Sequence, residues 1–168
     1  MTDIRPAVSE DDWERARILI REFAAWHRKS HQEDLELIQK YFGEKAFENE
    51  LGSVSTKYGP PGGRLLLAYS DRLAGCVALR RLNDENCEMK RMFVRTQHQR
   101  KGIGRDLALA ILDEAKRLGY KRMFLDTSIR QLPAQALYRS IGFVDTEPYY
   151  DMPDEVRNWL VFMERPLA

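Results

Sequence analysis

The most informative stretch of the sequence is Glu88–Leu118, which reads EMKRMFVRTQHQRKGIGRDLALAILDEAKRL. It predicts a strand up to Val94, a loop with glycines at positions 102 and 104, and a helix whose apolar residues recur at helical spacing. A glycine loop that runs directly into a helix exposes backbone N–H groups at the positive end of the helix dipole. Such a site suits a pyrophosphate, because glycine lets the backbone approach the ligand closely.

Two other phosphate-binding motifs do not fit this loop. A P-loop would need Gly-Lys followed by Ser or Thr, and the dinucleotide-binding fingerprint would need a small residue where Leu107 stands. Positive charge surrounds the loop at Arg95, Arg100, Lys101 and Arg105. An ordinary strand–helix turn with a solvated basic rim is the alternative interpretation.

Working outward from this unit, the sequence predicts an α/β domain. Strands are expected at 3–7, 64–70, 73–82, 87–94, 123–127, 143–146 and 159–164. Helices are expected from Ser9 to Ala24, from Glu33 to Leu51, over Gly104–Leu118 and from Pro133 to Ser140, with loops at 52–63 and 147–156. The fold class is therefore a single domain over 1–168, with a mixed, mostly antiparallel sheet of six to seven strands flanked by about four helices.

Composition narrows the class of protein. The chain has 168 residues, 43% of them hydrophobic, and 27 basic against 26 acidic residues leave a net charge of +1. This near-zero charge argues against nucleic-acid binding through phosphate contacts. No apolar run approaches the roughly 18 residues of a membrane span, and the first six residues lack the apolar core of a signal peptide. A soluble, cytoplasmic protein without a membrane partner is expected.

The cysteines point to neither a disulfide nor a metal. Cys76 and Cys87 are the only two, they have no CxxC spacing, and no neighbouring His completes a zinc site. Pairing of their two strands about the turn at 83–86 puts Cys76 opposite the far end of the second strand rather than opposite Cys87. We expect two small buried thiols.

Two separated motifs resemble one family. Gln99-x-x-Gly102-x-Gly104 is similar to the Gln/Arg-x-x-Gly-x-Gly/Ala signature of the GNAT superfamily, the acyl-CoA-dependent N-acetyltransferases, and 88–94 resembles the strand before it. Ala134-x-x-Leu137-Tyr138-x-x-x-Gly142-Phe143 resembles the second hallmark of that superfamily. The predicted order of elements also resembles a GNAT sheet, and the likeness is weakest before residue 64.

The resemblance implies acetyl-CoA as co-substrate, held in a splayed gap of the sheet. It implies that the backbone of Met92, Phe93 and Val94 pairs with the pantetheine arm, and that the amides of Arg100, Lys101, Gly102, Ile103, Gly104 and Arg105 cradle the pyrophosphate. Gln99 belongs to the signature, and Gln131 stands where many members carry Asn seven residues before the Tyr.

The resemblance also proposes the catalytic groups. Tyr138 matches the general acid that protonates the departing thiolate; the alternative is a Tyr buried for packing. Glu88, fourteen residues before Gly102, matches a Glu that some members use to deprotonate the amine through water. Its alternative is a salt bridge with Lys90 or Arg91.

Other polar residues carry weaker hypotheses. His27 and His31 are candidates to line an acceptor pocket between the first two helices, or else are packing residues. Tyr149, Tyr150 and Asp151 are candidates to meet a cationic amine, or else form an ordinary exposed loop.

The leading hypothesis is transfer of an acetyl group to the primary amine of a small molecule, such as an amino acid or a polyamine, in a ternary complex. Two alternatives remain: a regulatory module that binds acyl-CoA without turnover, and an acetyltransferase of protein N-termini or lysines. GNAT relatives are frequently dimers, so a homodimer is a further expectation.

Overall fold

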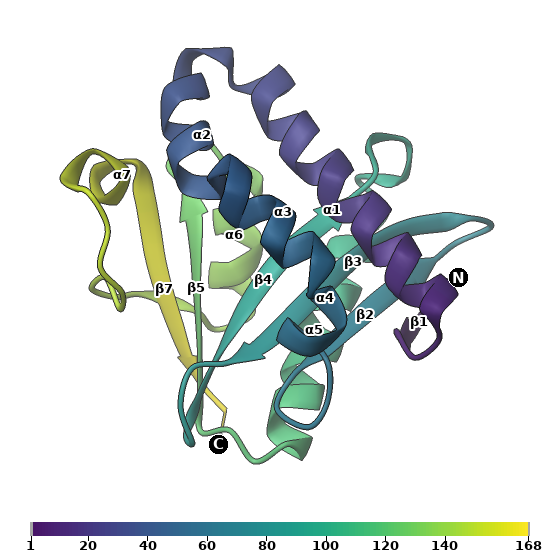
Figure 1. Ribbon diagram of the computed structural model, residues 1–168. Helices are drawn as coiled ribbons and strands as arrows, with labels where there is room; N and C mark the ends of the chain where they lie inside the picture. Colours follow the sequence, from purple (N-terminus) through teal and green to yellow (C-terminus); the bar gives the residue numbers. More distant parts are fainter. Residues whose placement is uncertain (1, 168) are drawn as a thin grey trace.

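The computed structural model describes residues 2–167, so Met1 and Ala168 of the predicted domain lie outside the described residues. Its centre is a seven-stranded sheet in the order β1-β2-β3-β4-β5-β7-β6 (Figure 1). The strands are β1 (Asp3–Pro6), β2 (Arg64–Tyr69), β3 (Leu73–Arg81), β4 (Asn86–Val94), β5 (Arg122–Ser128), β6 (Val144–Asp145) and β7 (Leu160–Pro166). Within these residues only β4 and β5 pair in parallel, which confirms the prediction of a mixed, mostly antiparallel sheet.

Helices cover both faces of the sheet and create two cores. One face carries α1 (Glu10–Ser30), α2 (Leu35–Phe42), α3 (Glu44–Gly52) and α4 (Val54–Lys57), and α7 (Asp154–Trp159) joins this core just before β7. The other face carries α5 (Ile103–Arg117) and α6 (Leu132–Ser140). The apolar stripe of α5, including Leu107, Ile111 and Ala115, is fully buried against the sheet, as its helical spacing predicts.

The helix count is the main difference from the sequence prediction. Seven α-helices lie within residues 2–167, against about four predicted. The expected helix from Glu33 to Leu51 is broken at Gly43, whose φ of +62° lies in the left-handed region that favours glycine. One short helical turn, α4, occupies part of the predicted loop 52–63, and α7 starts inside the predicted loop 147–156 and includes Trp159, which was expected in the last strand.

The local sequence explains where α1 begins. The side chain of Ser9 accepts a hydrogen bond from the backbone of Asp12, and the Asp12 carboxylate accepts one from the backbone of Ser9. This reciprocal capping box satisfies N–H groups that a helix start leaves unpaired. The predicted start at Ser9 is confirmed, and α1 extends six residues beyond Ala24, to Ser30.

A bulge and a short parallel pairing open the middle of the sheet. In the β3–β4 ladder Cys76 faces Phe93 and Ala78 faces Lys90, so an extra residue of β4 bulges at Arg91, whose φ is 55°. The parallel β4–β5 ladder covers only 86–88 and 122–124, and beyond it the two strands diverge (Figure 1). From position 89 onward, β4 therefore has no strand partner on its β5 side among the described residues.

The cysteines lie as the sequence predicts. Cys76 and Cys87 are buried free thiols, and Cys87 faces Arg81 rather than Cys76 across the ladder. Over residues 2–167, none of the helices combines the length and the apolar character that crossing a membrane requires.

Candidate active site

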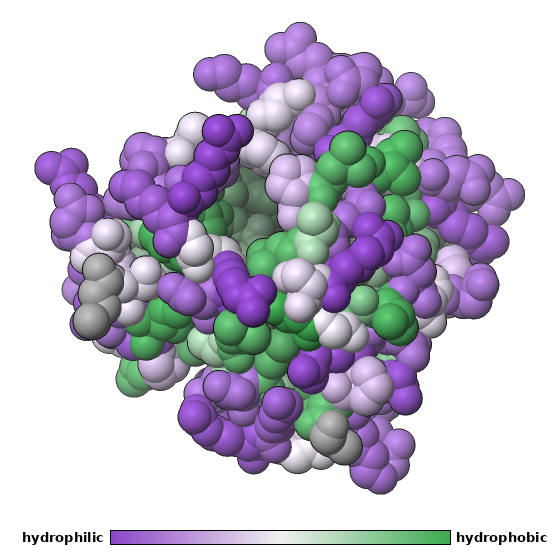
Figure 2. All heavy atoms as spheres, turned by 180° about the vertical axis from the view of Figure 1, so that it is seen from behind, coloured by the Kyte–Doolittle hydropathy of each residue, from purple (hydrophilic) through white to green (hydrophobic). Residues whose placement is uncertain are grey.

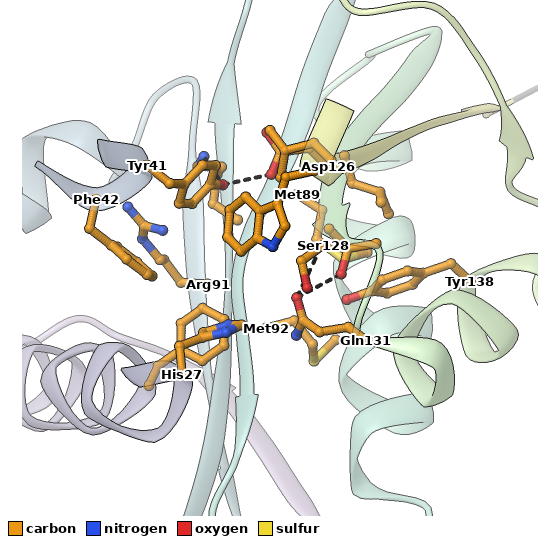
Figure 3. A pocket seen from close by; sticks show the side chains of 16 residues that line it. His27, Tyr41, Phe42, Met89, Arg91, Met92, Asp126, Ser128, Gln131 and Tyr138 are labelled. Atoms are coloured by element: carbon orange, nitrogen blue, oxygen red, sulfur yellow. Dashed lines mark hydrogen bonds between the residues drawn. The ribbon is translucent and has the colours of Figure 1, made fainter. Parts of the chain in front are cut away.

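The gap between β4 and β5 holds a small cavity of about 50 Å³. Figure 3 shows Tyr138 of α6 directed into this gap from one side, and His27 of α1 and Tyr41 of α2 on the other. The walls come from β4, β5, α1, α2, α6, the end of α7 and the start of β7, so segments far apart in the sequence meet here.

A larger groove of about 620 Å³ leads into this gap from the N-terminus of α5. The groove and the gap cavity share Phe23, Met92 and Gln131 as lining residues, so they adjoin. Seen from behind, the molecular surface is hollowed, and both hydrophobic and hydrophilic residues border the depression (Figure 2). The groove brings together all the predicted cofactor residues except Lys101, namely Met92, Phe93, Val94, Gln99, Arg100, Gly102, Ile103, Gly104, Arg105 and Gln131.

The glycine loop has the geometry that its sequence predicts. Gly102 has a φ of +82° and Arg100 a φ of +63°, so the chain turns sharply before α5. No side chain caps α5, which leaves its first N–H groups open for a ligand. The amide nitrogen of Gln99 donates to the carbonyl oxygen of Val94 over 2.9 Å and ties the loop to the end of β4.

Gln131 lies where the groove meets the gap. Its amide oxygen accepts from Oγ1 of Thr127 over 2.8 Å and from the backbone N–H of Ser128 over 3.2 Å (Figure 3). These two hydrogen bonds orient the Gln131 side chain and are both accepted by its amide oxygen. Beside it, the hydroxyl of Ser128 is buried and has no hydrogen-bond partner among the described residues.

Tyr138 is buried and remains protonated. Only 5% of the residue is exposed, and its ring packs edge-on against Phe143 at 5.9 Å. Burial raises the pKa of the phenol, and the negative charge of Asp126 raises it further. A neutral phenol that points into the gap is able to donate a proton there.

Glu88 is fixed by two partners, neither of which the sequence identified. It is 1% exposed; its Oε1 accepts from Nε of Arg80 over 2.6 Å, and its Oε2 accepts from the hydroxyl of Tyr149. The expected alternative, a salt bridge with Lys90 or Arg91, is wrong. Register explains this, because Arg80 lies directly opposite Glu88 in the antiparallel β3–β4 ladder.

The two residues named in that alternative have other partners. Arg91 is buried and donates two hydrogen bonds to Glu50 of α3, over 2.7 and 2.8 Å. The bulge turns it toward the helices, and the opposite charge of Glu50 offsets the cost of its burial. Nζ of Lys90 donates to the hydroxyl of Tyr41 over 3.2 Å.

A pair of phenols holds a second carboxylate beside the gap. Tyr41 and Tyr150 donate to the two oxygens of Asp126, over 2.6 and 2.5 Å. Sequence reasoning missed Tyr41 and Asp126; the strand 123–127 was predicted, but its parallel placement beside Glu88 depends on pairing across the sheet. Tyr150 and Asp151 line a further cavity of about 390 Å³, which also contains Glu88.

The two histidines are neighbours, with ring centres 5.9 Å apart, but they line different cavities. His27 lines the gap cavity, packed against the rings of Phe23 at 4.6 Å and Trp26 at 5.1 Å. Burial lowers the pKa of His27 from 6.5 to about 4, and the nearby His31 adds to this effect, so its ring is neutral at pH 7. His31 instead lines the groove. Over residues 2–167 no group of three potential metal ligands is present.

The class of protein follows from this arrangement: an α/β transferase whose open glycine loop and groove lead to a buried phenol in a split sheet. Residues 14–143 match the model of the acetyltransferase (GNAT) family. The chain belongs to this family, as its motifs predict, and is an N-acetyltransferase.

Relatives and solved structures agree. An uncharacterized N-acetyltransferase of Schizosaccharomyces pombe is 40% identical over 124 residues, which cover 70% of this chain and 76% of that protein. A GNAT-family acetyltransferase from Staphylococcus aureus superimposes with a TM-score of 0.75 at 22% identity, covering both chains completely. The PaiA N-acetyltransferase of Thermoplasma acidophilum, solved in complex with coenzyme A, gives a TM-score of 0.69 at 19% identity over 99% of each chain.

Proposed function

We propose that this enzyme transfers an acetyl group from acetyl-CoA to the primary amine of a small molecule, such as an amino acid or a polyamine. One observation carries the proposal: the groove at the N-terminus of α5 continues into the gap where Tyr138 lies. The coenzyme A bound to the structurally similar PaiA enzyme supports this choice of co-substrate.

The residues of the groove suit acetyl-CoA. The amides from Arg100 to Arg105 would hold the pyrophosphate at the uncapped start of α5, with Arg100 and Arg105 adding positive charge. The unpaired edge of β4 at Met92, Phe93 and Val94 would bond the pantetheine arm as a further strand would. The acetyl group would then lie in the gap, near Tyr138 and Gln131.

The reaction proceeds by direct attack within a ternary complex. The neutral amine attacks the thioester carbonyl carbon, and the C–S bond breaks as the tetrahedral intermediate collapses. The amine nitrogen loses one proton, and the departing thiolate gains one from Tyr138. Tyr138 is protonated at neutral pH and its side chain points into the gap, so its hydroxyl can supply this proton.

Glu88 is the proposed base, acting through a water molecule. Each carboxylate oxygen of Glu88 accepts one hydrogen bond, from Arg80 or Tyr149, and retains further acceptor capacity for a water. Asp126 is a second candidate, because its carboxylate lines the gap cavity itself and is oriented by two phenols.

A small acceptor fits the remaining space. The cavity of about 390 Å³ beside Glu88 meets the gap cavity at Tyr41, Phe42, Lys90 and Arg91. This volume lies within the range of small-molecule pockets, roughly 300–1,000 Å³. A cytoplasmic location and a homodimer complete the proposal, and light scattering of the purified protein tests the homodimer.

Two measurements test the proposed function. Calorimetric titration of the purified protein with acetyl-CoA should give saturable binding, and a thiol-release assay against a panel of amines should reveal turnover. Absence of acetyl-CoA binding would refute the assignment of the groove. Tight binding without turnover on any amine would favour the regulatory module instead.

A further inference from the structure

The cavity beside Glu88, called the acceptor cavity below, is lined by more basic than acidic side chains. Its lining includes five basic residues, Lys40, Lys57, Arg80, Lys90 and Arg91, against three acidic ones, Glu50, Glu88 and Asp151. A pocket that binds a polyamine would have more acidic than basic side chains, because each ammonium group of the ligand needs a hydrogen-bond acceptor or a negative charge.

The buried carboxylates of this cavity are already engaged. Glu50 accepts two hydrogen bonds from Arg91 and one from Nζ of Lys57 over 3.1 Å, so one carboxylate serves two cations. Glu88 is bound to Arg80 over 2.6 Å. Neither Glu50 nor Glu88 therefore offers an unengaged negative charge to an incoming cation.

Lys40 and Asp151 lie toward the solvent. Lys40 pairs with Glu155 and, over 3.4 Å, with Glu36, both of which lie outside the cavity lining. Asp151 is exposed. These two opposite charges add no net charge to the interior of the cavity.

Lys90 is the cation that lacks a carboxylate partner within the described residues. Its Nζ donates to the hydroxyl of Tyr41 over 3.2 Å and lies 5.4 Å from the centre of the same ring. That hydroxyl donates in turn to Asp126, so the nearest carboxylate is one phenol away and is bound by two phenols already. The inner part of the cavity thus has one cation more than it has carboxylates. The four cations are Lys57, Arg80, Lys90 and Arg91, and the three carboxylates, with the adjacent Asp126 included, are Glu50, Glu88 and Asp126.

Lys90 also lies where the acceptor cavity meets the gap cavity. It lines both the acceptor cavity and the gap cavity, whose other walls include Tyr138 and Gln131. A group bound at Nζ of Lys90 therefore lies in the passage from the acceptor cavity to the proposed thioester. The lowered pKa of Lys57 agrees with crowded positive charge: burial is its main cause, and Lys90 and Arg91 lower it further.

We propose that the acceptor carries a carboxylate close to its primary amine, as an amino acid does, and that Lys90 binds this carboxylate. The inference rests on the proposed function and narrows its substrate class from amines in general to amino acids. The carboxylate would supply the negative charge that the cavity lacks, and would hold the amine at the entrance to the gap. The aromatic rings of Phe42 and Tyr150 would meet the remainder of the molecule.

The test compares amino acids with their carboxamides and with the corresponding decarboxylated amines, which differ only at the group that Lys90 is proposed to bind. With wild-type enzyme, kcat/KM for the best amino acid should exceed that of its decarboxylated amine by about tenfold to a hundredfold, the range for a hydrogen bond to a charged group. Equal or better turnover of the decarboxylated amine would overturn the inference while leaving the proposed function intact.

Variants assign the effect to Lys90. Lys90→Gln should raise KM for the amino acid about tenfold or more and leave that of the decarboxylated amine nearly unchanged, whereas Lys90→Arg should retain the preference. Lys90→Glu should reverse the preference toward the amine. Lys116→Gln, on the exposed side of α5, is the matched control. A Lys90→Gln enzyme that stays folded and keeps the wild-type preference would refute the role of Lys90.

A binding measurement separates this inference from the reaction. Calorimetric titration of the coenzyme A-loaded wild-type protein with each amino acid and its decarboxylated amine needs no turnover and no variant. Tighter binding of an amino acid supports the inference even if no amine is acetylated, in which case only the proposed function fails. Binding of neither compound, or of the amine alone, overturns it.

Discussion

Arg80 and Glu88 face each other directly across the β3–β4 ladder and are joined by a hydrogen bond of 2.6 Å from Nε to Oε1. Glu88 is almost completely buried, whereas the side chain of Arg80 is 34% exposed. The pair places a buried carboxylate, with a compensating charge, beside the strand gap. The same ion pair therefore stabilises the β3–β4 ladder and fixes the carboxylate that is proposed to act as the base.

Removing the cation of this pair should destabilise the fold. Arg80→Met leaves the Glu88 carboxylate buried with only the Tyr149 hydroxyl as partner. We expect the free energy of unfolding to fall by about 2 kcal/mol, below the roughly 3–5 kcal/mol of a fully buried pair because Arg80 is partly exposed. Urea denaturation measures the change. Arg81→Met, which loses only an exposed pair with Asp84, is the control and should cost less than about 1 kcal/mol.

The acid role of Tyr138 predicts a specific kinetic effect. Tyr138→Phe should lower kcat about a hundredfold, because the thiolate then leaves without a proton donor, and should change the affinity for acetyl-CoA by less than about twofold. Steady-state kinetics and calorimetry measure the two quantities. Tyr120→Phe, whose hydroxyl bonds Gly62 instead, is the control. Unchanged kcat in Tyr138→Phe would exclude the acid role.

The base role of Glu88 predicts a loss of rate. Glu88→Gln should lower kcat about a hundredfold, because the neutral amide cannot accept the proton that the amine loses. Asp126→Asn, measured in the same way by steady-state kinetics, should keep a kcat close to that of the wild type. If Glu88→Gln keeps the wild-type kcat and Asp126→Asn loses it, the base is Asp126.

The pyrophosphate site is tested at Gly104. A Cβ placed there would meet Leu137 at 3.7 Å and Val94 at 3.8 Å, which are ordinary contacts, so the first atom of a side chain fits. Gly104→Val should fold, yet reduce acetyl-CoA affinity by about a hundredfold or more, because the added methyl groups crowd the bound pyrophosphate. Gly52→Ala, where a Cβ has open space, is the control. Wild-type affinity in a folded Gly104→Val protein would contradict the assignment of the loop.

His27 predicts a dependence of stability on pH. Its folded pKa of about 4 lies below the usual 6.5, so between these values the unfolded chain binds a proton that the folded one does not. Stability should therefore fall as pH drops from 6.5 toward 4, by up to about 1.4 kcal/mol per pH unit from this group. Denaturation of wild type and His27→Leu over that range measures it, and the variant should lose less stability. Parallel curves would contradict the prediction.

The sequence by itself predicted the strands, the helix α5, the family and the residues that line the groove, but not the number of helices. Some features act over a few neighbouring residues, so the structure that they form can be predicted from the sequence. They are the capping box at Ser9, the apolar stripe of α5 and the glycines at 102 and 104. The residues that line the groove are close in sequence for the same reason: most of them belong to one strand–loop–helix unit.

Only the tertiary structure decided the lining of the proposed acceptor cavity. Glu88 pairs with Arg80 through strand register, Arg91 reaches Glu50 through a bulge, and Lys90 meets Tyr41 through the packing of α2 on the sheet. These partners are 8, 41 and 49 residues apart. The spacing of residues along the chain does not specify such contacts, because they form only when strands pair and helices pack. Strand pairing and helix packing therefore decide which of several possible partners each charged side chain meets.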